Sequence, residues 1–297
     1  MEYSKIFHKA LKISGLALAL FLFGSIYFMS KSGIKKSTIQ ISSKSPPPQI
    51  QKVLAKQTVV TKASTPSATP TDKPAGFCLN VPVLFYHHIE PYAQAKTEGH
   101  ASLTVDAGFF DRQMQYLVSH GYHTITAEDL AQALLHQKIL PSKPIAVTID
   151  DGYSDIPTYA FPVAQKYHVL LNLMIPTGLL NNPGYMSWDN LKNMVNSGVV
   201  FAYDHSWSHY SMPAGNDTKD QMEIMTAKTQ LEQHLGGTVN IFTYPYGSTD
   251  NRIINLLRND GFIAAFSTKG GFLQCDSFIY DLHRTRIGNA SLSAYGL

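Results

Sequence analysis

Hydrophobic and polar positions alternate in blocks along residues 77–297, and the period of the pattern changes from one block to the next. Short apolar runs predict buried strands, whereas apolar positions three or four residues apart predict amphipathic helices. Strands are expected at residues 81–86, 122–125, 145–149, 169–175, 199–203, 239–243, 262–266 and 282–287. Helices are expected between most of them, and Thr126, Ser187 and Asp250 are placed to cap three of the helices.

The regular alternation of strands and helices determines the predicted fold class. A strand that is followed by a helix and another strand favours parallel strands joined by crossover helices. We therefore predict an α/β fold, built as an incomplete or distorted (β/α) barrel of about seven parallel strands. A doubly wound open sheet is the alternative that this pattern leaves open.

The amino-terminal region has a different pattern. Residues 13–29 form an uncharged apolar run with lysines on both sides, and membrane-spanning helices need at least about 17 such residues. Bulky side chains occupy residues 26–29, where a signal peptidase would require small ones. Residues 1–30 are therefore interpreted as an uncleaved transmembrane signal anchor, with a cleavable signal peptide as the alternative.

Composition separates this anchor from the folded region. Residues 31–76 are rich in Ser, Thr, Pro and Lys, and Asp72 is their only acidic residue. Such a segment cannot bury enough apolar surface to fold, so a disordered linker is predicted ahead of a domain at 77–297. The formal net charge of the whole chain is +3, which is too small to indicate a nucleic-acid partner.

The chain has two cysteines, Cys78 and Cys275, which lie in the first and last parts of the predicted domain. In an oxidising compartment they could pair, which would stabilise the domain by about 4–5 kcal/mol in the chain-entropy model. Two unpaired buried thiols are the alternative. Neither cysteine belongs to a C-x-x-C pair of the kind that binds metal.

Four polar clusters each follow directly after a predicted strand, at residues 87–88, 150–151, 205–209 and 244–247. The Asp150-Asp151-Gly152 cluster alone could be an ordinary turn, because Asp and Gly are common turn residues. Parallel strands of a barrel, however, end at one face, and the active sites of (β/α) barrels lie there. The shared position of the clusters therefore indicates a functional site.

The histidines of the third cluster point to a metal. His205 and His209 are four residues apart, so on a helical turn both imidazoles would reach the same ion. Two histidines and one carboxylate form a common catalytic zinc set, which would leave the other aspartate free as a general base. The sequence predicts a divalent-metal site, with zinc preferred over cobalt or nickel. Trp207, between the histidines, is expected to pack there or to stack on a sugar ring.

These clusters resemble the successive motifs of a known family. Residues 148–152 (Thr-Ile-Asp-Asp-Gly), 205–209 (His-Ser-Trp-Ser-His) and 244–247 (Tyr-Pro-Tyr-Gly) are similar to motifs of polysaccharide deacetylases, the NodB-homology or carbohydrate esterase 4 family. Residues 81–88 and 109–122 resemble the branch that de-N-acetylates poly-β-1,6-N-acetylglucosamine. The resemblance covers residues 81–287 in order and implies a NodB-like barrel.

The resemblance also implies a role for individual residues. Asp150 would be the general base, and the backbone N–H of Tyr246 would face the oxyanion. The implied metal ligands are Asp151, His205 and His209. The expected substrate contacts are His88, Trp207, Tyr244 and Pro245.

Two positions depart from the family pattern. Many members have an arginine two residues before the proline of the third motif, where it orients the base, but this chain has Thr243. The poly-β-1,6-N-acetylglucosamine branch also lacks that arginine, and Arg284 or Arg286 could replace it. The general acid is not evident either: His283 is the candidate, although a surface or core histidine fits the sequence equally well.

The implied activity is metal-dependent removal of N-acetyl groups from N-acetylglucosamine residues of an extracellular polysaccharide, with poly-β-1,6-N-acetylglucosamine preferred. Peptidoglycan or a chitin-like glycan is the alternative substrate. A carbohydrate-binding protein without turnover is a further alternative, which the complete ligand set argues against. The expected partners are the polysaccharide and, through the anchor, the cell membrane, with the catalytic domain on the extracellular or periplasmic side.

Overall fold

The computed structural model describes residues 76–297. The predicted anchor at 1–30 and the predicted linker at 31–76, apart from Gly76, lie outside the described residues. Within the described part, no helix combines the length and the apolar character that a bilayer crossing requires.

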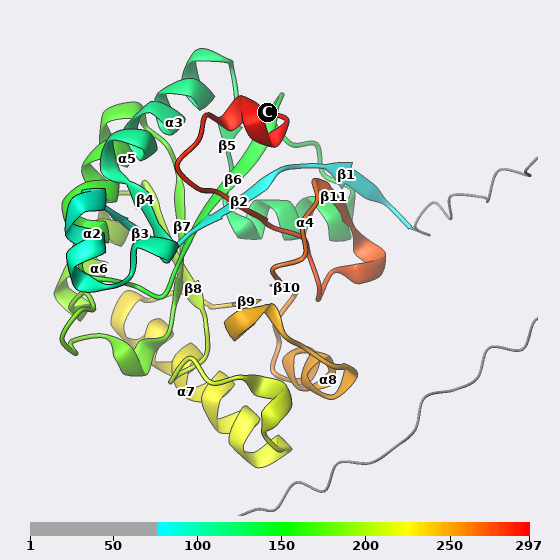
Figure 1. The fold of residues 1–297 in the computed structure, drawn as a ribbon. Coiled ribbons are helices and arrows are strands. Elements are labelled where there is room, and N and C mark those ends of the chain that lie inside the picture. Colours follow the sequence, from blue (N-terminus) through cyan, green and yellow to red (C-terminus); the bar gives the residue numbers. More distant parts are fainter. Residues whose placement is uncertain (1–75) are drawn as a thin grey trace, which may run out of the picture. The chain divides into compact units, whose positions relative to one another are not determined.

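A parallel β-sheet forms the centre of the described domain (Figure 1). Its strands follow the order β10-β9-β8-β7-β6-β2-β12, and β5 pairs with the start of β6. All pairings in this sheet are parallel. The strands are β2 (Val83–Tyr86), β5 (His123–Thr124), β6 (Pro144–Asp150), β7 (Leu171–Ile175), β8 (Val200–Asp204), β9 (Ile241–Thr243), β10 (Ala264–Phe266) and β12 (Thr285–Arg286).

The sheet curls until its two end strands approach each other. Leu282, shortly before β12, forms a parallel bridge with Phe266 of β10, and β12 then pairs with β2 at the other edge. The same segment is held again by a hydrogen bond from the Arg284 backbone N–H to the carbonyl of Lys269. The architecture is therefore the predicted incomplete barrel, with seven parallel strands in order and β5 beside β6 as an additional short strand, and the open doubly wound alternative is wrong.

Helices surround the strands in Figure 1, as crossover connections between parallel strands require. Three helix starts were expected from capping residues, and each is confirmed: the side chains of Thr126, Ser187 and Asp250 accept a hydrogen bond from the backbone N–H three residues further on. The helices are α2 (Tyr92–Glu98), α3 (Ala107–Ser119), α4 (Ala127–His136), α5 (Phe161–Tyr167), α6 (Trp188–Asn196), α7 (Asp217–Leu235) and α8 (Asn251–Asn259).

Two pairs of three-residue strands were not expected from the sequence. β1 (Cys78–Asn80) pairs with β11 (Leu273–Cys275) in antiparallel register, with Cys78 opposite Cys275. The two cysteines are joined in a disulfide, which confirms the predicted pairing. The second pair is β3 (His88–Glu90) and β4 (Thr104–Asp106), which run parallel. Three residues are too few to show a hydrophobic period, so neither pair could be distinguished from a loop.

Apolar side chains fill both faces of the sheet. On β2, Leu84 and Tyr86 belong to the cluster that includes the α3 residues Phe110 and Met114. Val83, the residue before Leu84, belongs to a second cluster with residues of β6, β9 and β10 that face the barrel interior. Alternate residues of each strand therefore point either into the barrel or toward the helices. This alternation decides which polar residues at the strand ends reach a common site.

Candidate active site

A cavity of about 310 Å³ lies at the carboxyl ends of the barrel strands. It brings together six of the predicted site residues, from three separate segments of the chain. The lining residues are His87, Leu103, Asp150, Asp151, Tyr153, Leu179, Tyr185, His205, His209, Tyr244, Tyr246, Thr268 and Arg284. The predicted convergence of the strand-end clusters is therefore what the fold produces.

Asp150, the last residue of β6, forms a buried ion pair. Arg284 donates two parallel hydrogen bonds to it, Nη1 to Oδ1 at 2.7 Å and Nη2 to Oδ2 at 2.8 Å. The same Nη1 donates to Thr148 Oγ1, and Nε donates to the carbonyl of Ser267. Arg284 is 1% exposed. Burial alone would raise the pKa of Asp150, but the charge and hydrogen bonds of Arg284 outweigh it and lower the pKa, so the carboxylate stays ionised.

Asp151 reaches the same cavity because the chain turns sharply after β6. Continued strand alternation would direct Asp151 away from Asp150, but Asp151 and Gly152 have positive φ angles of 71° and 68°. Asp151 Oδ1 consequently lies 3.5 Å from His205 Nε2 and 3.2 Å from His209 Nε2. This oxygen is buried and has no hydrogen-bond partner.

The two histidines lie on a loop after β8, and the helical turn expected for them is wrong. Residues 205–209 are irregular, with positive φ angles of 64° at Ser206 and 57° at His209. Side chains hold the loop in this shape. The Ser206 N–H donates to Asp204 Oδ1 at 2.7 Å, and Ser208 donates from both N–H and Oγ to Glu223 of α7.

The hydrogen bond of His205 fixes its tautomer. Its Nδ1 lies 2.7 Å from the carbonyl oxygen of Thr243, so Nδ1 carries the proton and Nε2 presents its lone pair toward Asp151. Burial and the neighbouring His205 lower the pKa of His209 to about 4. His209 is thus available as a neutral ligand.

The geometry of Asp151, His205 and His209 fits a transition-metal ion. Ligands bound tetrahedrally to zinc at about 2.0–2.1 Å lie about 3.3–3.4 Å apart, and the two Asp151–histidine distances are 3.5 and 3.2 Å. The orphaned carboxylate oxygen needs a cation because a buried, unpaired charge is strongly unfavourable. The donor set of two imidazoles and one carboxylate suits zinc and related ions.

Comparison with known proteins relates part of this chain to a known family. The polysaccharide deacetylase family model matches residues 137–265, a stretch that contains all three ligands and Asp150. Bacillus subtilis (strain 168) YxkH, whose name places it among the polysaccharide deacetylases, is 26% identical over 227 residues, which cover 76% of this chain and 77% of that protein. Residues 137–265 of the chain form a polysaccharide deacetylase domain.

Two further likenesses are more distant. The poly-β-1,6-N-acetyl-D-glucosamine N-deacetylase of Staphylococcus epidermidis is 22% identical over 193 residues, which cover 61% of this chain and 66% of that protein. The structure of the Streptococcus pyogenes deacetylase PplD, solved in complex with acetate, superposes on this one with a TM-score of 0.66 at 23% identity. The match covers 71% of this chain and 93% of the PplD chain. At that identity, the second likeness shows a common fold.

Not all predicted site residues of the deacetylase line the cavity. The His283 ring stacks on Phe278, with ring centroids 4.8 Å apart, and lies outside the cavity. Trp207 lies against Gly178, and the backbone N–H of Gly178 donates a hydrogen bond to the carbonyl of Trp207. Pro245 is buried beside the cavity. His88 lines a different cavity, described below.

His87 is the residue that the sequence reasoning missed. It lines the cavity with Asp150, Asp151 and Arg284. Burial lowers the pKa of His87, and the charges of the two aspartates oppose that effect. The sequence has two adjacent histidines at this point. The alternation of side chains along β2 places His87 on the same side as Phe85, in the barrel interior, and the two rings are neighbours. Because both faces of β2 are apolar, the sequence pattern could not show this.

The turn after β9 places Tyr244 and Tyr246 at the cavity. Tyr244 is buried, and its hydroxyl donates to the carbonyl of Tyr280 at 2.8 Å. Tyr246 has a φ angle of 61°, and its side chain is 66% exposed. Its ring meets that of His209 edge-on, with centroids 4.6 Å apart. Tyr246 therefore forms an outer wall of the cavity, next to the candidate metal ligands.

The ion pair of Asp150 yields a prediction with a matched control. Arg284→Met should leave Asp150 as an unpaired buried carboxylate, raise its pKa, and cost about 3–5 kcal/mol of folding stability. Asp150 contributes stability above its unfolded pKa, because Arg284 lowers the folded pKa, and this contribution should be missing from the variant at pH 7. Chemical denaturation over a pH series measures the loss.

Arg286→Met is the control, since Arg286 lies at the surface and donates only to the carbonyl of Ser102. It should unfold within about 0.5 kcal/mol of the unmodified protein. Equal destabilisation by the two substitutions would show that the ion pair of Asp150 has no special role.

Proposed function

We propose that this enzyme removes N-acetyl groups from N-acetylglucosamine residues of an extracellular polysaccharide in a metal-dependent hydrolysis. The observation that carries the proposal is the convergence of an arginine-held carboxylate and a two-histidine, one-carboxylate set in one cavity. We further propose poly-β-1,6-N-acetylglucosamine as the substrate. The support is the Staphylococcus epidermidis relative of that name and the sequence motifs shared with that branch.

Each residue has a distinct part in the proposed reaction. A zinc-type ion held by Asp151, His205 and His209 would polarise the acetamide carbonyl and make water more acidic. Asp150 accepts the proton of the attacking water, and Arg284 keeps its two oxygens in a fixed orientation. The Tyr246 backbone N–H stabilises the oxyanion.

His87 is the proposed general acid, in place of His283. Cleavage of the C–N bond requires a proton on the leaving nitrogen, and His87 lies in the cavity with both aspartates. The electron pair of the C–N bond goes to nitrogen, which takes the proton from the His87 imidazole. Acetate and the amine of a glucosamine residue are the products.

The location is proposed on similar grounds. The Cys78–Cys275 disulfide supports an oxidising compartment, because disulfides persist outside the cytoplasm. Together with the apolar run at residues 13–29, it favours a membrane-anchored enzyme whose catalytic domain lies on the extracellular or periplasmic side.

Acetate release tests the substrate. The purified protein is incubated with N-acetylglucosamine oligomers of equal length linked β-1,6 or β-1,4, and the released acetate is quantified. We expect faster release from the β-1,6 oligomers. Preference for β-1,4 oligomers would indicate peptidoglycan or a chitin-like glycan, and no release from either would favour a binding protein without turnover.

The two aspartates should differ in metal content. Asp151→Asn weakens a ligand, so it should lose both metal and activity. Asp150→Asn leaves the ligand set intact, so its metal content should stay near the unmodified value while the rate falls about 100-fold or more. Metal analysis and acetate assays on the two variants measure this. Loss of metal from Asp150→Asn alone would reverse the two assignments.

The acid is tested by a pair of histidine variants. His87→Gln should lower the rate of acetate release about 100-fold or more and remove the alkaline limb of the pH–rate profile, which reports loss of the protonated acid. His283→Gln should retain the activity and the pH profile of the unmodified enzyme. If His283→Gln is the inactive variant, the sequence-based assignment was right and His87 is not the acid.

A further inference from the structure

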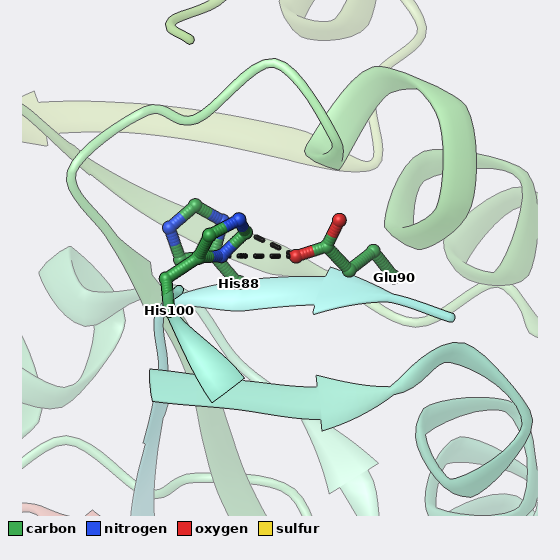
Figure 2. Close-up of side chains that lie close together, drawn as sticks. All are labelled: His88, Glu90 and His100. Atoms are coloured by element: carbon green, nitrogen blue, oxygen red, sulfur yellow. Dashed lines mark ion pairs between the residues drawn. The ribbon is translucent and has the colours of Figure 1, made fainter. Parts of the chain in front are cut away.

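A second cluster of candidate metal ligands lies outside the catalytic cavity. Among residues 76–297, two groups of three His, Asp or Glu residues bring their ligand atoms within 4.8 Å of one another: Asp151, His205 and His209, and also His88, Glu90 and His100. Figure 2 shows the two imidazoles of the second group beside the Glu90 carboxylate. The cluster lines its own cavity of about 500 Å³.

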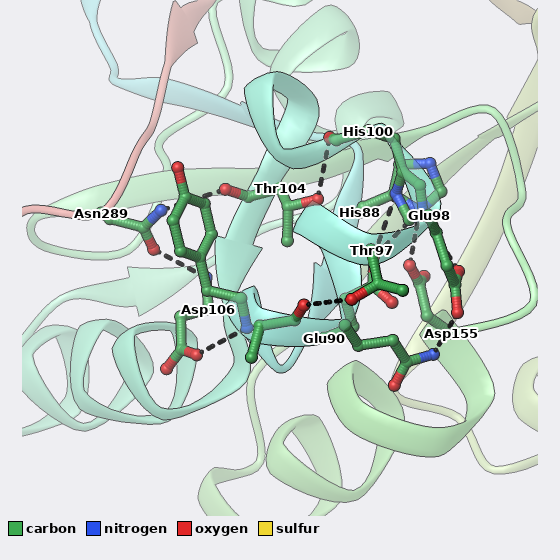
Figure 3. Close-up of polar contacts among 12 residues, drawn as sticks. His88, Glu90, Thr97, Glu98, His100, Thr104, Asp106, Asp155 and Asn289 are labelled. Carbon is green, nitrogen blue, oxygen red and sulfur yellow. Dashed lines mark hydrogen bonds and ion pairs between the residues drawn. The ribbon is translucent and has the colours of Figure 1, made fainter.

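The local fold explains how the cluster forms. His88 and Glu90 are the first and last residues of β3, so they share one side of the strand, while Ile89 packs into the core. His100 belongs to the connection between α2 and β4. Its carbonyl accepts a hydrogen bond from Thr104 Oγ1 at 3.1 Å, and Asn289 bonds to the backbone at Thr104 (Figure 3).

Two buried atoms without a hydrogen-bond partner lie at the centre of the cluster. The Nε2 atom of His100 donates to Glu98 Oε2 at 3.0 Å. The Nδ1 atom of the same ring lies 3.0 Å from Glu90 Oε1. Neither Nδ1 nor Oε1 has a hydrogen-bond partner, and Glu90 is 1% exposed. A cation held by these two atoms would neutralise the buried carboxylate.

The catalytic ligand set shows the same arrangement. There, His205 donates from one ring nitrogen to a carbonyl and presents the other to Asp151 Oδ1, which likewise lacks a hydrogen-bond partner. The carboxylate–histidine distances are 3.2 and 3.5 Å in the catalytic set, and the distance from His100 Nδ1 to Glu90 Oε1 is 3.0 Å in the second cluster. These distances lie close to the separation of about 3.3–3.4 Å expected around tetrahedral zinc.

Asp155 fixes the orientation of His88. Its Oδ2 accepts a hydrogen bond from His88 Nδ1 at 2.6 Å, and its Oδ1 is buried without a partner. Two imidazoles with one carboxylate suit zinc and similar ions, whereas magnesium and calcium prefer oxygen ligands alone. The carboxylate of Glu98 on His100 matches the outer hydrogen bond that metal-binding histidines usually make.

We propose that His88, Glu90 and His100 bind a second divalent transition-metal ion, with zinc best matched. Through the hydrogen bond of His88 to Asp155, this ion is linked to the segment after β6, which carries Asp151 and Tyr153. The ring of Tyr153 stacks on His88, with centroids 3.6 Å apart, and Tyr153 and Tyr185 line both cavities. The second ion therefore holds a shared wall of the active-site cavity. The inference does not rest on the deacetylase reaction.

Counting bound metal tests the proposal. The full chain is loaded with zinc, dialysed, and analysed for zinc per polypeptide. We expect about two equivalents in the unmodified protein, one in Glu90→Gln, one in Asp151→Asn and none in the double variant. His123→Gln is the matched control, since this exposed histidine contacts only Ser142, and it should keep both equivalents.

The outcomes separate this site from the catalytic one. If the catalytic set binds no metal but the second site does, Asp151→Asn keeps the single equivalent and Glu90→Gln loses it. If Glu90→Gln does not fold, His100→Gln is used, and the single equivalent retained by Asp151→Asn supports the site by itself. The proposal is overturned if Asp151→Asn retains no zinc, or if a folded Glu90→Gln binds as much zinc as the unmodified protein.

Discussion

Burying carboxylates without leaving their charge unpaired is the constraint that shapes this site. A buried carboxylate must be neutralised by a proton or paired with a cation, because an isolated buried charge is strongly unfavourable. The chain uses the first solution at Asp204, whose pKa burial raises well above its usual value. It uses the second at Asp150, where Arg284 supplies the cation. Asp151 has neither, and its Oδ1 instead faces ring nitrogens of His205 and His209.

The backbone at the strand ends brings the site residues into one cavity. Strand alternation directs Asp150 and His87 into the barrel, and positive φ angles at Asp151 and His209 bring in two side chains that regular structure would direct elsewhere. Backbone of this kind is costly for residues other than glycine, so surrounding contacts must hold it. The hydrogen bonds from the loop to Asp204 and Glu223 provide that support at the histidines.

Much of this could be predicted from the sequence, and the failures have identifiable causes. The strand–helix alternation gave the barrel because long parallel strands are buried and their apolar runs are plain. The motif at Asp150 and Asp151 was informative because adjacent carboxylates seldom follow a buried strand without a reason. His87 and His88 could not be told apart, because β2 is apolar on both faces and shows no period of two. The cluster at Glu90 and His100 depends on three-residue strands, whose pairing is decided by tertiary contacts.

The arginine that keeps Asp150 ionised also limits its chemistry. A general base works best when its pKa lies near the working pH, and Arg284 lowers the pKa of Asp150 below that of an ordinary aspartate. Asp150 can then deprotonate water effectively only if something else makes that water more acidic. The neighbouring set of Asp151, His205 and His209 is suited to hold a cation that does so. In the proposed reaction, the ion pair and the metal set therefore depend on each other: Arg284 fixes the charge and orientation of Asp150, and the bound cation makes the water acidic enough for Asp150 to accept its proton.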